Sequence, residues 1–376
     1  MKIRYSRATS DGAMYKNGVL GVKNGRFDAA ADGEELDLTQ YLVCPGFIDM
    51  HTHGGAGIDS MKTNAEGLSQ LSMHYASCGV AVFHPTTVTA TLDDMLRAIE
   101  MTKAAMQAGT RGACINGIYL EGPYLSAKYR GAHEEALLRD PDMAELDRLL
   151  AAADGIIRVV TIAPERAGAL AAISHLRAHG VRVSLGHSAA TQQEAEAAIN
   201  AGGNIAVHTY NAMAPLNHRN VGLLGMSLGR DDVYNELICD LIHVCPEALR
   251  LVYLCKNPKN IILITDSMDA TGMSDGQYQL GNLSVTVTNG VARTETGALA
   301  GSTLRSNIAL RNVVTALGIP VETAVMGLTC NPASALGQPD IGTLQTGARA
   351  HLTALDENFN VVLTMVDGNI VYDARA

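Results

Sequence analysis

The sequence of 376 residues has no run of about 18 or more apolar residues and no apolar signal-peptide stretch behind its first residues. We therefore expect no membrane-spanning helix, no membrane partner and a cytoplasmic location. Positive charge is also scarce, because 28 Lys and Arg stand against 38 Asp and Glu, a formal net charge of -10. This charge argues against a nucleic-acid partner, whereas a small anionic substrate remains compatible with it if cations are gathered locally.

The cysteines show no Cys-X-X-Cys pair, and their number, seven, is odd. Most lie in apolar surroundings: Cys44, Cys78, Cys114, Cys239, Cys245, Cys255 and Cys330. This usage predicts reduced thiols in the core rather than disulfides or metal ligands. With 47% hydrophobic residues, the chain is long enough to bury a large core.

Short apolar runs alternate with stretches of helical periodicity through the middle of the chain, a pattern typical of parallel strands joined by crossover helices. The runs lie at 47–53, 80–84, 115–121, 156–162, 181–187, 204–208, 236–240 and 261–266. Eight parallel strands close a (β/α)₈ barrel. The sequence thus predicts an α/β fold with a TIM-like barrel over residues 47–341.

Both ends of the chain differ from the middle. Residues 1–46 contain short alternating runs with Asn-Gly turn pairs at 17–18 and 24–25, and residues 342–376 end in a similar pattern. We expect the two ends to pair into one small β-domain, a β-sandwich outside the barrel. Residues 273–298 also have the pattern of strands and turns, which predicts a β-excursion after the last barrel strand.

Five of the eight predicted strands end in histidines or carboxylates that are candidate metal ligands. Side chains two apart on a strand share a face, so His51 and His53 can hold one cation together; the alternative is two histidines that merely end a strand. The other strand-end residues of this kind are Glu121, His187, His208 and Asp266. Reactive groups of barrel enzymes lie at the C-terminal ends of the strands, so these side chains are predicted to form a site for zinc or a similar divalent ion.

Each of these residues also has a structural interpretation. His187 would serve equally well as a hydrogen-bonded core histidine, and Asp266 as the N-cap of the next helix. Glu121 favours the ligand interpretation, because a carboxylate after an apolar strand is costly to bury unless it is paired or bound to a metal. His133, in a loop after the third strand, is as compatible with an exposed position as with a functional one.

A set of short motifs spans nearly the whole chain: Pro45-Gly46-Phe47-Ile48-Asp49, His51-Thr52-His53-Gly54, Leu120-Glu121-Gly122-Pro123, Lys128-Tyr129-Arg130-Gly131-Ala132-His133, Gly186-His187-Ser188, His208-Thr209-Tyr210-Asn211-Ala212-Met213 and Thr265-Asp266. Together they resemble the N-acetylglucosamine-6-phosphate deacetylase family of the amidohydrolase superfamily. His-X-His alone marks only the superfamily. The Leu-Glu-Gly-Pro, Gly-Ala-His and Tyr-Asn-Ala-Met elements mark the deacetylase branch.

The resemblance implies a metal site with one or two divalent ions per subunit. It assigns the principal ion to Glu121, His187 and His208, and a second ion to His51 and His53. Zinc is the expected metal, with iron, cobalt or manganese as alternatives. Relatives that use a carboxylated lysine on an early strand are disfavoured, because the corresponding position is Glu121.

The resemblance also implies roles in catalysis and substrate binding. A divalent ion makes water acidic enough for Asp266 to accept its proton and later return it to the leaving amine, while His133 stabilises charge on the carbonyl oxygen. The implied substrate contacts are Ala132, His133, Asn211, Ala212, Asp240, His243, Leu299, Ala300 and Gly301. Arg219 has a guanidinium that matches phosphate oxygens. The resemblance implies that it binds the phosphate and reaches the neighbouring site of a homodimer. The sequence alone is equally compatible with a solvated loop arginine.

The implied reaction is hydrolysis of the acetamide of N-acetyl-D-glucosamine 6-phosphate to glucosamine 6-phosphate and acetate, in amino-sugar catabolism and cell-wall sugar recycling. Two departures bear on the epimer at carbon four: Leu241 stands where the family usually has glycine, and Asp269 adds a carboxylate near Asp266. The alternatives are the same reaction on N-acetylgalactosamine 6-phosphate, or an amidohydrolase acting on N-acyl amino acids or cyclic amides. A barrel that has lost catalysis and serves as an interaction protein is a further alternative.

Overall fold

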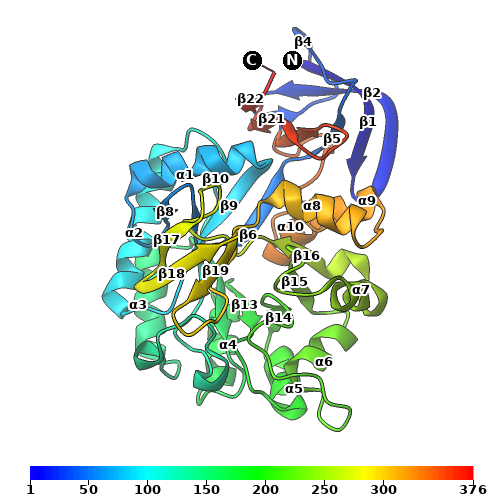
Figure 1. Cartoon of the computed structure of the whole chain (residues 1–376). Helices are drawn as coiled ribbons and strands as arrows, with labels where there is room; N and C mark the ends of the chain where they lie inside the picture. Colours follow the sequence, from blue (N-terminus) through cyan, green and yellow to red (C-terminus); the bar gives the residue numbers. More distant parts are fainter. Residues whose placement is uncertain (376) are drawn as a thin grey trace.

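The structure, a computed structural model, describes residues 1–375 and joins a parallel barrel to a mixed β-sheet (Figure 1). The barrel sheet has 9 strands, of which β10 (Cys114–Ile115) is a two-residue addition beside the second. The other strands are β6 (Phe47–Thr52), β9 (Val80–Thr87), β11 (Ile118–Leu120), β12 (Ile157–Ile162), β13 (Arg182–Leu185), β14 (Gly203–Ala206), β15 (Tyr234–Ile238) and β16 (Ile261–Ile264). The predicted eight-stranded barrel is confirmed.

The barrel closes between β6 and β16. The carbonyl oxygen of His51 accepts a hydrogen bond from the N–H of Asp266 at 3.0 Å, and the carboxylate of Asp49 accepts one from the hydroxyl of Thr265 at 2.6 Å. These contacts bring the first and last barrel strands together although 216 positions separate Asp49 from Thr265. The C-terminal ends of β6 and β16 therefore lie side by side, and so do the candidate functional residues that these ends carry.

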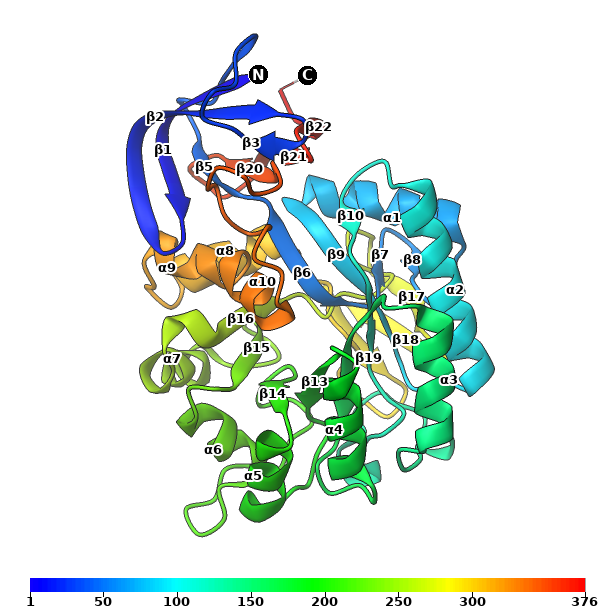
Figure 2. The same ribbon diagram turned by 180° about the vertical axis from the view of Figure 1, so that it is seen from behind.

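Helices surround the barrel, as the two opposite views show (Figure 2). They are α1 (Ala65–Ser77), α2 (Leu92–Ala108), α3 (Met143–Ala153), α4 (Ala169–Ala178), α5 (Gln192–Asn200), α6 (Gly222–Gly229), α7 (Pro246–Cys255), α8 (Ser306–Thr315), α9 (Val321–Met326) and α10 (Cys330–Leu336). Helix α2 shows how the sequence produces them. The side chain of Thr91 caps its N-terminus, and Met95, Ala98, Ile99 and Thr102 recur at helical spacing on its buried face.

Both termini build the second sheet, which lies at one end of the barrel (Figures 1 and 2). Its strands are β1 (Lys2–Ser10), β2 (Ala13–Lys23), β3 (Arg26–Phe27), β4 (Glu35–Asp37), β5 (Leu42–Pro45), β20 (Leu352–Leu355), β21 (Val361–Val366) and β22 (Asn369–Asp373), hydrogen-bonded as one mixed sheet. Strand β5 pairs with β20 from the other end of the chain, so Cys44 faces Thr353. The predicted pairing of the two chain ends is confirmed, and it forms a single mixed sheet of 8 strands.

Three antiparallel strands, β17 (Gly276–Leu280), β18 (Leu283–Thr288) and β19 (Val291–Thr294), follow β16 as a separate sheet near the barrel mouth. Two carboxylates hold its first turn: Asp269 accepts the N–H of Gln279 at 3.1 Å, and Asp59, at the end of the short β7 (Gly54–Gly55) and β8 (Ile58–Asp59) pair, accepts that of Gly281 at 2.9 Å. These bonds fix Leu280, which is buried, at the mouth.

Two expectations from composition can be checked directly. Within residues 1–375, no helix has the length and apolar content needed to cross a membrane. All seven cysteines are free of disulfide bonds, but the predicted core location holds for only part of the set. Cys44, Cys78 and Cys239 are buried, whereas Cys245 and Cys255, at the two ends of α7, are exposed.

Candidate metal and active site

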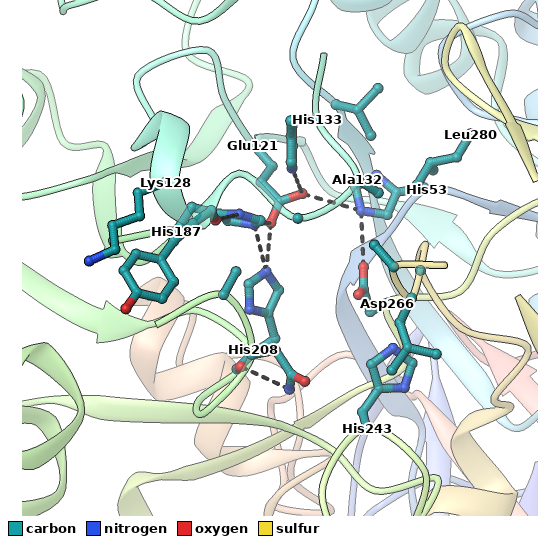
Figure 3. Close-up of a pocket in the computed structure, with 18 residues that line it drawn as sticks. His53, Glu121, Lys128, Ala132, His133, His187, His208, His243, Asp266 and Leu280 are labelled. Carbon is teal, nitrogen blue, oxygen red and sulfur yellow. Dashed lines mark hydrogen bonds and ion pairs between the residues drawn. The ribbon is translucent and has the colours of Figure 1, made fainter. Parts of the chain in front are cut away.

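A cavity of about 320 Å³ opens at the carboxyl ends of the barrel strands (Figure 3). The side chains at its base come from segments that are remote in sequence, and several follow their strands immediately. Glu121 stands one residue past β11, whereas His187, His208 and Asp266 stand two residues past β13, β14 and β16. The barrel thus brings the strand-end residues predicted from the sequence together at one mouth.

Three of these residues have a backbone conformation that residues other than glycine rarely adopt. The φ angles are +45° at His187, +23° at His208 and +51° at Asp266. A positive φ in a non-glycine residue costs free energy and is found where the surrounding structure enforces it, commonly at functional sites. Each strand therefore ends in a sharp turn that directs its last polar side chain into the mouth.

The carboxylate of Glu121 lies at the centre of a ring of imidazoles. Its Oε1 is 2.9 Å from Nε2 of His208, 3.2 Å from Nε2 of His187 and 3.6 Å from Nε2 of His51. Its Oε2 is 3.3 Å from Nε2 of His133 and 3.4 Å from Nε2 of His53. One carboxylate therefore faces histidines on both sides of the ring.

Asp266 completes the second side of the site. Its Oδ1 lies 3.0 Å from Nε2 of His53 (Figure 3) and 3.5 Å from Nε2 of His51. Two sets of buried ligand atoms each lie within 4.8 Å of one another: His51, His53 and Asp266 form one, and Glu121, His133 and His187 form the other. Two clusters joined through Glu121 are consistent with the binuclear metal site typical of amidohydrolases.

The orientation of the imidazoles tests whether these residues suit a metal. Nδ1 of His187 lies 2.9 Å from the carbonyl oxygen of Tyr129, and Nδ1 of His53 lies 3.2 Å from that of Thr86. A carbonyl only accepts, so each Nδ1 carries the proton and each Nε2 presents a lone pair to the centre. Nε2 of His51 is buried and has no hydrogen-bond partner among the described residues. Nitrogen and oxygen donors in this arrangement fit zinc or a similar divalent ion.

His133 has the opposite tautomer. Its Nδ1 accepts the backbone N–H of Thr89 at 3.1 Å and lies 2.7 Å from the hydroxyl oxygen of the same residue. The neutral ring must then carry its proton on Nε2, the atom that faces Glu121 at 3.3 Å. His133 is therefore a hydrogen-bond donor toward the cavity, although distance alone groups it with the candidate ligands.

The charged states of the site follow from burial and proximity. Burial opposes ionisation of Glu121, but the surrounding imidazoles, His51 foremost, hold its pKa well below the ordinary value. Burial also lowers the pKa of His187 to about 4, so this imidazole is neutral, as a ligand must be. For Asp266, burial is outweighed by the neighbouring imidazoles, His53 foremost, which lower its pKa to about 2. Both carboxylates are thus ionised at neutral pH.

The residues expected to contact substrate separate into two groups. The cavity is lined by Ala132, His133, Asn211, Ala212, His243, Leu299 and Gly301, together with Val88 and Leu280. Ala300 is fully buried and does not line it. Asp240 instead contacts His243, with its Oδ2 2.6 Å from Nδ1 of that ring, so it orients a lining residue.

The cations near the cavity also differ from expectation. Arg219 is exposed in the loop after β14 and does not line the cavity of its own chain. Lys128 lines the cavity instead, with its Nζ 5.4 Å from the centre of the Tyr129 ring. The sequence motif contained Lys128, but the spacing of the motif gave no reason to assign it a role.

Two residues singled out as departures do not line the cavity. Leu241 is half-buried against the barrel core with φ of +67°, a conformation that favours glycine. Asp269 is turned toward the backbone of Gln279 and supports β17. Neither side chain therefore contacts the cavity directly.

Comparisons with known proteins match most of the chain. The model of the amidohydrolase family matches residues 42–371. The chain belongs to the amidohydrolase family, in its branch of amino-sugar-6-phosphate deacetylases. It is 44% identical to the N-acetylgalactosamine-6-phosphate deacetylase of Escherichia coli O157:H7 over 88% of this chain and 87% of that protein. It is 38% identical to the N-acetylglucosamine-6-phosphate deacetylase of Vibrio furnissii over 93% and 87%.

Solved structures extend the likeness to the whole fold. A mutant of the N-acetyl-D-glucosamine-6-phosphate deacetylase of Mycobacterium smegmatis, in complex with N-acetyl-D-glucosamine-6-phosphate, superposes with a TM-score of 0.93 at 36% identity, covering 99% of each chain. The Thermotoga maritima N-acetylglucosamine-6-phosphate deacetylase gives a TM-score of 0.91 at 32% identity, covering 100% of each. The deacetylase branch thus shares both barrel and terminal sheet with this chain.

Proposed function

We propose that this enzyme hydrolyses the acetamide of N-acetyl-D-glucosamine 6-phosphate, releasing glucosamine 6-phosphate and acetate. The observation that carries the proposal is the placement of Asp266 and His133 on the same cavity as the Glu121 centre. One residue is a carboxylate held ionised, and the other presents an N–H. Amide hydrolysis needs this pair, a base that takes a proton from water and a donor that faces the developing oxyanion.

Within the site, each of the chain's own residues has a separate role in the reaction. A bound divalent ion supplies an acidified water and polarises the acetamide carbonyl. Asp266, whose Oδ1 lies 3.0 Å from Nε2 of His53, accepts the proton from water and returns it to the nitrogen of the leaving amine. The Nε2–H of His133 donates to the carbonyl oxygen as negative charge develops on it.

The phosphate requires positive charge that one chain supplies only in part. Lys128 is at the cavity, but Arg219 of the same chain lies outside it. We propose a homodimer in which Arg219 reaches the cavity of the partner and binds the phosphate. Complementation tests this arrangement: Arg219→Ala and Asp266→Asn are each expected to be inactive alone, and their mixed dimer should regain activity because one intact site forms. Failure of mixing to restore activity would show that Arg219 acts within its own chain or not at all.

The second candidate is N-acetyl-D-galactosamine 6-phosphate, favoured by the 44% identity to the Escherichia coli O157:H7 enzyme. Acetate release from the two phosphorylated sugars, measured at equal metal content, decides between the candidates through the ratio of kcat/KM. The unphosphorylated sugars serve as controls. The proposal is wrong if the galacto substrate gives the higher kcat/KM, or if loss of the phosphate leaves the rate unchanged.

A further inference from the structure

A buried carboxylate lies behind the metal centre, on the side away from the cavity. Glu236, on β15, has no exposed surface. Its Oε2 lies 3.1 Å from Nδ1 of His51 and accepts the backbone N–H of His208 at 3.3 Å. Its Oε1 has no hydrogen-bond partner among the described residues. Glu236 therefore contacts two residues of the centre without facing the cavity itself.

The contact with Glu236 determines how His51 presents its ring. Oε2 of Glu236 already accepts the N–H of His208 and acts as an acceptor toward His51 as well, so Nδ1 of His51 carries the proton. The lone pair is then on Nε2, at the far end of the ring, 3.6 Å from Oε1 of Glu121 and 3.5 Å from Oδ1 of Asp266. This nitrogen is the one that a metal at the His51, His53 and Asp266 cluster would need.

Burying the carboxylate of Glu236 costs free energy, and a carboxylate is not needed merely to orient a histidine ring. His53 and His187 obtain the same ring orientation from the carbonyl oxygens of Thr86 and Tyr129. A buried carboxylate with one unpartnered oxygen gives up hydration that its remaining contacts do not fully replace. What the carboxylate adds over a carbonyl is negative charge, which strengthens the imidazole as a donor to a cation.

We propose that Glu236 is a positioning residue that holds His51 with its proton on Nδ1 and its Nε2 lone pair on the metal centre. Glu236 thereby controls how tightly the cluster of His51, His53 and Asp266 holds its ion. The contact with the backbone of His208 extends this control to the turn after β14, which carries a ligand of the other cluster. The proposal rests on the proposed metal-dependent function, but metal binding can be measured without any substrate.

The test is a zinc titration of the metal-free full-length protein against a chromophoric chelator. His51→Ala defines which equivalent of zinc depends on this imidazole. Glu236→Leu is expected to weaken that same equivalent by about 10-fold to 100-fold, the range found when an outer carboxylate of a metal-bound histidine is removed. The equivalent that survives in His51→Ala should keep its affinity within about threefold. Glu236→Gln retains an oxygen that accepts both hydrogen bonds, so it should weaken binding less than leucine does.

Glu165→Gln is the matched control. Glu165 also accepts hydrogen bonds beside a candidate ligand, from the hydroxyl of Ser188 and the N–H of Ala189, but it touches no imidazole. This variant should bind zinc as the wild type does. The melting temperature of each metal-free variant separates folding from metal affinity, and Glu236→Gln carries the test if Glu236→Leu does not fold.

Three results would overturn the proposal. One is unchanged zinc affinity in both Glu236 variants. Another is a lower melting temperature of the metal-free variants without any change in zinc affinity, which would make Glu236 a residue of the fold alone. The third is equal zinc binding by His51→Ala and the wild type, since His51 would then hold no ion to position. A protein that binds zinc as expected but releases no acetate would instead refute the proposed reaction and leave this inference standing.

Discussion

Nδ1 of His133 accepts hydrogen bonds from Thr89, whereas Nδ1 of His187, 4.6 Å away between ring centres, donates to a carbonyl. Adjacent imidazoles at one carboxylate therefore have opposite tautomers. Backbone groups set this difference: an N–H of the loop after β9 faces one ring, and the carbonyl oxygen of Tyr129 faces the other. The result is one ring with a lone pair for a metal and one with a proton for a substrate oxygen.

The tautomer of His133 leads to the first prediction. His133→Ala should lower kcat by about 100-fold to 1000-fold, the loss seen when an oxyanion donor is removed, while zinc content stays at the wild-type level. Thr89→Val removes the hydroxyl contact and retains the backbone one, so a loss of about fivefold in kcat is expected. Steady-state acetate release and metal analysis of the same samples measure both effects. Loss of zinc in His133→Ala would show that this ring is a ligand.

Asp266 gives the second prediction. Asp266→Asn retains the size of the side chain but removes the base, so kcat should fall by about 100-fold to 10,000-fold. At least one equivalent of zinc should remain, because Glu121, His187 and His208 are intact. The rate is measured after full metal loading, so that a weaker second site does not contribute to the loss. Near wild-type turnover with metal bound would exclude Asp266 as the proton-transferring group.

Lys128 gives the third prediction, which concerns the phosphate. The side chain is exposed at the cavity mouth, so solvent screens its charge and its contribution is modest. Lys128→Met should raise KM for the phosphorylated sugar by about fivefold with little change in kcat. The unphosphorylated sugar is the internal control, and its kcat/KM should be unaffected. An equal effect on both sugars would mean that Lys128 shapes the loop instead of binding the phosphate.

Asp269 gives the fourth prediction, a pH dependence of stability. Burial, with a smaller contribution from the charge of Asp59, raises the pKa of Asp269 to about 6 in spite of the hydrogen bond from Gln279 and the charge of Lys62. Because the folded pKa is above the unfolded value, the folded state binds the extra proton, and the ionised carboxylate destabilises it at neutral pH. This penalty should disappear as the pH falls from about 6 to about 4.

Asp269→Asn, which still accepts the N–H of Gln279, isolates the charge. The variant should melt above the wild type at pH 7, and the difference should shrink toward zero near the unfolded pKa of about 4. Thermal unfolding at a series of pH values measures this difference. A constant difference across the series would assign the effect to geometry, and a variant less stable at pH 7 would contradict the prediction.

The barrel could be predicted from the sequence because its causes are local. Apolar runs such as Ile261–Ile264 are buried in full, and several are followed within two residues by a histidine or a carboxylate. A carboxylate or imidazole at such a position is costly to bury without a partner, so Glu121 and Asp266 were recognisable as functional candidates. Glu236 offered a similar signal, a carboxylate within an apolar strand, but it precedes the strand end and was not singled out.

The sequence by itself determined the order of the strands, the residue types at their ends and the reaction class that those residues permit. The tertiary structure alone decided which atoms face one another: the proton on Nε2 of His133, the contact of Glu236 with His51, and the placement of Lys128 at the cavity with Arg219 outside it. The reason is physical. Strand and helix patterns arise from neighbours within a few positions, whereas a tautomer or an ion's donor set depends on hydrogen-bond partners that only folding brings within about 3 Å.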